Sequence, residues 1–289
     1  MRRACIDIGS NTTRLLVAEC APGHLLEVHQ ERAFTRIGRG LRAENRISAE
    51  KICEVERVAR QQLAQALSMG AREVHAVATA AIRHARNGSE LIAAIRAGCG
   101  LQVRVLSGEE EAQLAFRGAA GTLGRQLAGT LGVVDVGGGS CELVVGSAPN
   151  RVSWATSLSI GSGDVADEFL HSDPPSSGEL REARRRVQDA LADLEVPTPA
   201  EAVAVGGSAG SLRRVAGPVL GEEDFSRALQ LLGRHSADEV ARRFALDRER
   251  VRLLPAGLLI LQQAARLFGA PLQIGRGGVR EGVLLEASA

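Results

Sequence analysis

The sequence predicts an α/β protein of two domains with related folds around a cleft. Residues 6–17 recur in outline as residues 134–145, with Asp, Gly, hydroxyl and apolar positions in one register. In each half a hairpin leads a β-sheet, and alternating helices follow it, which implies two α/β domains. At 289 residues the chain is also longer than one hydrophobic core usually serves, and its length suits two domains.

Each copy of the repeat reads as a strand ending in Asp-x-Gly, a tight turn of small residues and a second strand. Glycine lets backbone N–H groups approach a ligand closely, and hydroxyls add donors for phosphate oxygens. An Asp in each turn can hold a hydrated divalent cation, Mg²⁺ or Mn²⁺. The pair therefore predicts a clamp for a phosphate chain and its metal, with two ordinary hairpin turns as the alternative. The candidate residues are Asp7, Asn11 and Thr12 in the first copy and Asp135, Gly137, Gly138, Gly139 and Ser140 in the second.

The periodicity of apolar residues predicts the elements between the two hairpins. Ser48 caps an amphipathic segment that ends near Gly70, which fits a helix. Residues 172–178 form the clearest loop. The other predicted elements are strands over 73–80, 102–106 and 152–159, and helices over 90–97 with Ser89 as cap, from Gly108 onward, and over 179–194.

Two further glycine-rich stretches suggest anion contacts. Residues 204–212 lie at a strand-to-helix junction, where backbone N–H groups favour an anion, so Gly207 and Ser208 are candidates. The stretch lacks the Lys of a Walker loop and the dinucleotide spacing, and a close-packing turn is the alternative. Residues 275–282 precede the final helix and offer Arg280, for which a helix cap with an intrahelical ion pair is the other interpretation.

Composition limits the possible partners. The formal net charge is only +1, so the chain as a whole has no positive electrostatic field that would attract nucleic acid or an acidic membrane. Lys51 is the only lysine, and arginine therefore supplies nearly all the positive charge. The five cysteines include no C-x-x-C pair, and no apolar run reaches membrane-spanning length. We expect a cytoplasmic protein.

Six segments together resemble the exopolyphosphatase and guanosine pentaphosphate phosphohydrolase (Ppx/GppA) family. The most specific are those that begin at Asp7, Ser107 and Val134, in this order and at these separations. The resemblance implies two actin-like (ribonuclease H-like) domains with mixed sheets flanked by helices around an interdomain cleft. The implied domains are 1–125, to which a helix at about 277–289 returns, and 126–276. The six segments are residues 7–17, 78–87, 107–114, 134–140, 206–210 and 279–282.

The same resemblance implies the roles of individual residues. It places Glu111 at the catalytic glutamate and Asp7 and Asp135 in two phosphate-binding loops that hold the metal. It places Arg83 along the phosphate channel, and Arg14 is a further candidate for gripping phosphates. The family usually has Arg where this chain has Gln113, which puts substrate length and affinity in question.

The implied reaction is stepwise release of orthophosphate from the end of inorganic polyphosphate, by metal-assisted in-line attack of water. The sequence ends after the second α/β domain, and this implies a preference for shorter chains. The resemblance also suggests a homodimer. Hydrolysis of guanosine pentaphosphate, a kinase and a non-catalytic phosphate or nucleotide sensor of the same fold remain as alternatives.

Overall fold

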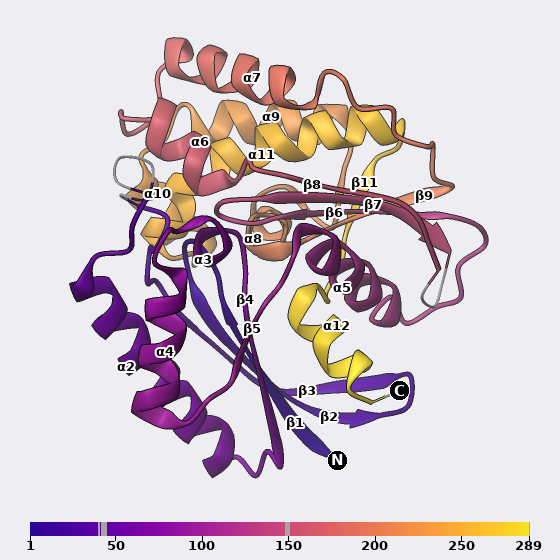
Figure 1. Cartoon of the computed structure of the whole chain (residues 1–289). Coiled ribbons are helices and arrows are strands. Elements are labelled where there is room, and N and C mark those ends of the chain that lie inside the picture. The colour runs from indigo at the N-terminus through magenta and orange to yellow at the C-terminus, as the bar shows by residue number, and fades with distance from the viewer. Residues whose placement is uncertain (40, 42–44, 148–150, 289) are drawn as a thin grey trace. The chain divides into compact units, whose positions relative to one another are not determined.

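The computed structural model describes residues 1–39, 41, 45–147 and 151–288. The chain folds into two compact units (Figure 1). Unit 1 contains Met1–Thr122 and the residues from Gly277 onward, and unit 2 contains Leu123–Arg276. Each unit is a mixed β-sheet with flanking helices.

In unit 1 the described strands form one sheet in the order β3-β2-β1-β4-β5. Strand β1 is antiparallel to β2 and parallel to β4, so the sheet is mixed. The strands are β1 (Arg2–Ile8), β2 (Thr13–Ala21), β3 (His24–Ala33), β4 (Glu73–Ala78) and β5 (Val103–Val105). The helices are α2 (Ala49–Ser68), α3 (Ala80–His84), α4 (Gly88–Cys99), α5 (Gly108–Gly121) and α12 (Val279–Glu286).

Both faces of this sheet are covered. Successive strand residues point to opposite faces, so neighbouring residues of β1 enter different cores. Ile6 and Ile8 pack with residues of α2 and α4, whereas Cys5 packs with residues of α5 and α12. Figure 1 shows α2 and α4 on one side of the sheet and α5 and α12 on the other. Helix α12 comes from the end of the chain and completes the core of unit 1.

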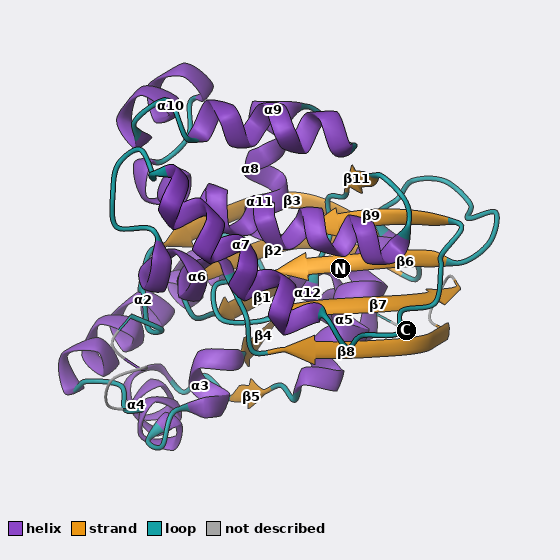
Figure 2. Cartoon of the chain, turned by 90° about the horizontal axis from the view of Figure 1, so that it is seen from above, coloured by secondary structure: helices purple, strands orange, loops and turns teal. Residues whose placement is uncertain are grey.

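In unit 2 the described strands form a sheet in the order β10-β11-β9-β6-β7-β8, and Figure 2 shows β9, β6, β7 and β8 side by side. The strands are β6 (Leu131–Val136), β7 (Cys141–Ser147), β8 (Arg151–Leu158), β9 (Glu201–Val205), β10 (Val219–Leu220) and β11 (Leu272–Ile274). The helices are α6 (Ser162–Phe169), α7 (Ser177–Leu191), α8 (Gly206–Ala216), α9 (Glu222–Leu232), α10 (Ala237–Phe244) and α11 (Arg248–Phe268).

Helix α11 is the central core helix of unit 2. It is apolar around most of its circumference, as expected of a helix that other elements surround. By length and composition it is also the one described helix that could cross a membrane, and 78% of its apolar window is buried inside the structure.

Most of the predicted elements are present, with one wrong cap. Ser48 caps α2 by accepting a hydrogen bond from the Lys51 amide, as predicted. Ser89 does not cap α4, because it lies inside the helix and Asn87 is the residue before it. The Asn87 side chain instead bonds both backbone groups of Ile47, at 2.8 and 2.9 Å. This long-range bond fixes the start of α4, and the local pattern did not reveal it.

Candidate active site

The two predicted turns have the same backbone geometry. In unit 1 the Gly9 amide donates to the Thr12 carbonyl at 3.0 Å, and in unit 2 the Gly137 amide donates to the Ser140 carbonyl at 2.9 Å. A Cβ on Gly9 would lie 3.1 Å from the Thr12 carbonyl oxygen, and one on Gly137 would lie 3.2 Å from that of Ser140. Both positions are therefore tight for any larger residue, and the sequence repeat is a repeat of structure.

The surrounding strands repeat as well. Strands β1 and β6 each pair antiparallel with the next strand and parallel with a later strand, β4 or β9. A helix begins directly after each later strand, α3 in unit 1 and α8 in unit 2. Ligands of open α/β sheets bind beyond the carboxyl ends of the strands. In each unit this edge carries the turn and the helix start together.

Asp7 has an unusual position in the unit 1 turn. Its Oδ1 atom is buried and finds no hydrogen-bond donor among the described residues. Burial raises the pKa of the Asp7 carboxyl, and the guanidinium groups of Arg14 and Arg280 offset part of the rise. Arg14 lies directly opposite Asp7 on β2. A buried carboxylate oxygen without a donor is unfavourable unless water or a cation meets it, so Asp7 fits a hydrated metal site.

Glu111 is the buried member of three successive glutamates at the start of α5. Glu110 closes a capping box with Ser107, and Glu109 accepts a hydrogen bond from Gln113 at 3.2 Å. The Glu111 side chain is only 7% exposed. Its Oε2 atom lies 3.0 Å from Nη1 of Arg83. The helix start therefore directs two of the acids to local surface contacts and the third to the interior.

Arg83 holds its position through a second bond. The same Nη1 atom donates to the Leu106 carbonyl at 2.7 Å, just before α5 begins. Arg83 lies on α3, directly after β4, so the carboxyl end of a central strand positions it. An arginine fixed in this way can orient a carboxylate and also offer its remaining N–H groups to an anion.

The unit 1 turn is supported from one side by residues 36–38. The Arg36 amide donates to the Asn11 carbonyl at 3.0 Å, and the Gly38 amide donates to the Ser10 carbonyl at 2.8 Å. Thr12 is buried at the turn. These bonds engage the outward carbonyl groups of the turn and fix its shape.

The start of α6 supports the unit 2 turn in the same way. The Ser162 amide donates to the Gly137 carbonyl at 2.9 Å, and the Gly163 amide donates to the Gly138 carbonyl at 2.9 Å. A Cβ on Gly161 would lie 2.2 Å from the Gly138 carbonyl carbon, so only glycine fits there. Sequence reasoning did not identify Gly161 as part of this site. The small residues of the Gly-Ser-Gly run after β8 were the one available signal.

The start of α8 approaches Asp135 closely. Gly206 has a φ of +89°, and a Cβ at this position would lie 2.3 Å from Oδ1 of Asp135. Next to it, a Cβ on Gly207 would lie 2.8 Å from two guanidinium nitrogens of Arg250. The Ser208 hydroxyl is buried and has no hydrogen-bond partner among the described residues. The structure thus brings Asp135, Gly207 and Ser208 to one edge of unit 2.

Arg250 is a site candidate that sequence reasoning missed. It lies in the first turn of α11, and only 5% of its surface is exposed. Two other arginines, Arg248 and Arg252, lie in the same turn region, and the sequence does not distinguish Arg250 from them. A buried guanidinium beside a glycine-rich helix start is suited to anion binding.

Arg280 has partners inside unit 1. Its Nη1 donates to the Leu15 carbonyl at 3.2 Å and its Nη2 donates to the Gln30 side chain at 3.3 Å. Glu281 lies 3.7 Å away and also bonds the Gly278 amide at 2.7 Å. The helix cap and the intrahelical ion pair, which were the other interpretation of this stretch, are therefore both present. A phosphate contact of Arg280 stays a prediction.

The acidic residues suit a metal held mostly through water. Among the residues that the structure describes, no three His, Cys, Asp or Glu side chains lie together as a direct metal cluster. Mg²⁺ keeps several waters in phosphate sites and needs one or two carboxylates. Asp7, with its buried Oδ1 that has no donor among the described residues, fits this requirement in unit 1.

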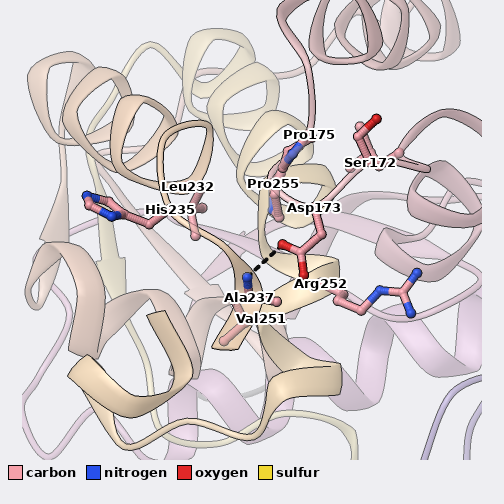
Figure 3. A pocket seen from close by; sticks show the side chains of 10 residues that line it. Ser172, Asp173, Pro175, Leu232, His235, Ala237, Val251, Arg252 and Pro255 are labelled. Atoms are coloured by element: carbon pink, nitrogen blue, oxygen red, sulfur yellow. Dashed lines mark hydrogen bonds between the residues drawn. The ribbon is translucent and has the colours of Figure 1, made fainter. Parts of the chain in front are cut away.

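A small pocket in unit 2 lies apart from the predicted residues (Figure 3). It holds about 30 Å³ between the 172–175 loop and the starts of α10 and α11, which is room for a water molecule. Its main polar group is already used, since Oδ1 of Asp173 accepts a hydrogen bond from the Ala237 amide at 2.7 Å (Figure 3). The pocket is therefore no alternative to the paired turns.

The two mixed sheets, each with an Asp-and-glycine turn at its edge, define a protein of two actin-like α/β units. Comparison with known proteins is more specific. The chain belongs to the Ppx/GppA phosphatase family, whose model matches residues 16–288.

Relatives and solved structures agree with this membership. Exopolyphosphatase 2 of Mycobacterium tuberculosis is 39% identical over 201 residues, which cover 66% of this chain and 61% of that protein. Exopolyphosphatase 1 of the same organism is 28% identical and covers 99% of this chain and 88% of its own length. The crystal structure of the Aquifex aeolicus family member is 28% identical, with a TM-score of 0.82 over 99% of this chain and 97% of that one.

Proposed function

We propose that this protein is an exopolyphosphatase that releases orthophosphate stepwise from the end of inorganic polyphosphate. The observation that carries the proposal is the buried Glu111, which Arg83 holds at 3.0 Å, in a chain with two glycine-rich turns. Relatives from the same family are named exopolyphosphatases and support the choice of substrate.

Each part of the reaction has a candidate group. Hydrolysis of a terminal phosphoanhydride needs an attacking water in line and stabilisation of the charge on the transferred phosphoryl group. Glu111 orients the water and accepts its proton, and Arg83 keeps this carboxylate in one position. The amides of Gly138 and Gly139 and the Ser140 hydroxyl bind phosphate oxygens, as do Asn11 and Thr12 of the other turn.

The metal and the arginines complete the proposal. Asp7 and Asp135 would hold hydrated Mg²⁺ or Mn²⁺, which supplies charge neutralisation to the phosphates when bound. Arg14 and Arg250 offer guanidinium groups for phosphates further along the chain.

Two finer points belong to the proposal. We expect shorter polyphosphate chains to be preferred, and we expect polyphosphate to be preferred over guanosine pentaphosphate. The Ppx/GppA name covers both types of enzyme, so a direct comparison of substrates decides the second point.

The test measures phosphate release with Mg²⁺ from short polyphosphate, long polyphosphate and guanosine pentaphosphate in parallel. Glu111→Gln should lower turnover of polyphosphate by roughly 10²–10⁴-fold, because an amide cannot accept the proton of water. Glu109→Gln is the matched control, since Glu109 lies on the same turn of α5 and bonds only Gln113 among the described residues. It should keep normal turnover.

Three results would change the assignment. Undiminished turnover in Glu111→Gln would remove this residue from the chemistry. Release from guanosine pentaphosphate alone would move the function to that nucleotide. No release from any of the three, together with phosphate transfer from a nucleotide to a hydroxyl acceptor, would indicate a kinase.

A further inference from the structure

The last helix of the chain packs against the helix that carries Glu111. Helix α12 belongs to unit 1, and Figure 1 shows it alongside α5. Leu114 of α5 lies in the same buried apolar cluster as Val283 and Leu284 of α12. Leu114 follows Glu111 by three residues, so the two side chains lie on one face of α5, and both are buried. The position of α12 therefore bears on the position of Glu111.

The two helices meet through their backbones at Gly282. A Cβ on Gly282 would lie 2.0 Å from the carbonyl oxygen of Leu114 and 2.7 Å from its carbonyl carbon. The backbone fixes the position of a Cβ, so no change of rotamer relieves this contact. Because protein interiors are close-packed and transmit strain, any larger residue at this position would move α5, α12 or both. Gly282 thus sets how closely α12 approaches the turn of α5 that follows Glu111.

The contact between the helices continues toward the end of α5. A Cβ on Gly118 would lie 1.9 Å from the carbonyl oxygen of Gly278. The amide of Gly277 donates to the Thr122 hydroxyl at 3.0 Å, and a Cβ on Gly277 would lie 2.4 Å from the Gly118 carbonyl oxygen. The close approach of the two backbones therefore extends from the second turn of α5 to its last.

Ion pairs connect the other end of α12 to the start of α5. Glu286, the last residue of α12, lies 3.1 Å from Arg104 of β5 and 3.3 Å from Arg117 of α5. Arg104 also pairs at 2.7 Å with Glu110, which closes the capping box of α5. Glu286 and Arg104 are exposed, and exposed ion pairs contribute little. The backbone contact at Gly282 is therefore the main constraint on α5.

The bond between Glu111 and Arg83 depends on where α5 lies. Arg83 is on α3, outside the contact of α5 with α12, and the Leu106 carbonyl fixes its Nη1 at 2.7 Å. A shift of α5 therefore changes the 3.0 Å distance from this Nη1 to Oε2 of Glu111. We propose that Gly282 is a positioning residue, whose close contact holds α5 where Glu111 meets Arg83. The inference rests on the proposed role of Glu111 in hydrolysis.

A crystal structure of Gly282→Ala tests the geometry without any activity. The distance from Oε2 of Glu111 to Nη1 of Arg83 should increase beyond about 3.5 Å, where the hydrogen bond is lost. Gly121→Ala is the matched control, since Gly121 also lies on α5 and faces α12. A Cβ there would meet Cδ1 of Leu285 at 2.5 Å, which is the flexible end of a side chain, so the control should keep the bond. An unchanged distance in Gly282→Ala would overturn the proposal.

Turnover gives the second readout, compared per folded protein as measured by circular dichroism. Gly282→Ala should lower kcat for polyphosphate by roughly 10²-fold with little change in KM, because Glu111 acts on the attacking water. In the Glu111→Gln background the same substitution should change residual turnover by less than roughly threefold, because no carboxylate is left to position. Equal losses in both backgrounds would give Gly282 a purely structural role and overturn the proposal.

A wild type that hydrolyses no polyphosphate would refute the proposed function. The crystal structures would still decide the positioning role in that case, because they measure the bond between Glu111 and Arg83 directly.

Gly277→Ala is the second variant if Gly282→Ala does not fold. Gly277 lies before α12, where the backbone is not helical and adjusts more easily. Its contact at Gly118 is about two turns of α5 away from Glu111. The loss in kcat should therefore be smaller, roughly tenfold, and it should again require Glu111. Normal turnover in folded Gly277→Ala would then overturn the proposal.

Discussion

The turns of unit 1 and unit 2 have one backbone design and different chemical surroundings. Asp7 lies opposite Arg14 on the neighbouring strand, whereas Asp135 lies opposite Glu142. In unit 1 the helix after the parallel strand contributes the side chain of Arg83. In unit 2 the corresponding helix begins at Gly206 and contributes backbone.

The difference indicates a division of tasks between two copies of one motif. The bonds within each turn are nearly equal in length, so the backbone was kept in both copies. Glu111, the candidate catalytic carboxylate, lies in unit 1, and the three successive glycines lie in unit 2. Unit 1 therefore offers fixed side chains, and unit 2 offers N–H groups and close approach. Gly206→Ala, Asp7→Asn and Glu179→Gln probe the two units, from the largest expected effect to the smallest.

The largest effect is expected from Gly206→Ala. A Cβ there would lie 2.3 Å from Oδ1 of Asp135, and the φ of +89° strains any residue other than glycine. The carboxylate must move, so turnover should fall by roughly 10²-fold, as for a misplaced catalytic group. The strain should also lower the free energy of unfolding by about 1–3 kcal/mol.

Gly210→Ala is the matched control for this substitution. Gly210 lies on the same helix, α8, and a Cβ there would meet no atom within 4 Å. Alanine should raise the free energy of unfolding by about 0.5–1 kcal/mol in this helix position without changing turnover. Equal turnover in the two variants would show that unit 2 does not depend on close backbone approach. Chemical denaturation and phosphate release measure both quantities.

A smaller effect is expected from Asp7→Asn in unit 1. The substitution removes a charge from a carboxyl whose Oδ1 is buried without a donor. Without divalent metal the variant should unfold about 2–4 °C higher, the shift that about 1 kcal/mol gives in a chain of this size. Turnover should fall by at least roughly tenfold, because the carboxylate that we propose as a metal ligand loses its charge. Thermal scans with and without Mg²⁺ provide the measurement.

The response to Mg²⁺ makes this prediction specific. The wild type should gain thermal stability on addition of Mg²⁺, and Asp7→Asn should gain less. A variant with a lower melting temperature in the absence of metal and an unchanged response to Mg²⁺ would give Asp7 a structural role only.

The sequence predicted the features that depend on near neighbours in the chain. The two hairpins follow from Asp-x-Gly followed by small residues. Glu111 was singled out by the family resemblance, and the structure adds the capping box that engages its neighbour Glu110. The sequence did not predict contacts between distant segments. Gly161 lies against Gly138 only because β8 leads the chain back across the sheet, and no local pattern encodes that approach.

Arg250 illustrates the same limit. Its position beside Gly207 depends on how α11 packs against α8, and its sequence neighbours are similar arginines. For Arg280 the sequence left a phosphate contact and a helix cap with an ion pair as two interpretations. The structure adds partners on β2 and β3 that neither interpretation named, and the phosphate contact stays a prediction. For both arginines the sequence gives the residue type and its place in the chain, but not the groups that the side chain contacts in the fold.

The smallest effect concerns acid stability, where a helix start of each unit can be compared. The Glu179 carboxylate accepts hydrogen bonds from the amides of His171, Ser172 and Ser176. Burial alone would raise its pKa, but these bonds outweigh burial and lower the pKa to about 2. In unit 1, Glu110 accepts from one amide, that of Ser107, and its pKa is also lowered.

A lowered pKa stabilises the folded state above the unfolded pKa near 4.5, and this stability is lost as the pH falls toward about 2. Glu179→Gln should therefore lower the free energy of unfolding by about 1 kcal/mol at pH 7, after allowance for solvent screening at this exposed site. Its deficit relative to wild type should vanish by about pH 2. Glu110→Gln should give a smaller deficit, because fewer amides hold that carboxylate. Denaturant titrations between pH 7 and pH 2 measure both, and a larger deficit in Glu110→Gln would show that the Arg104 ion pair, and not the amides, dominates at these helix starts.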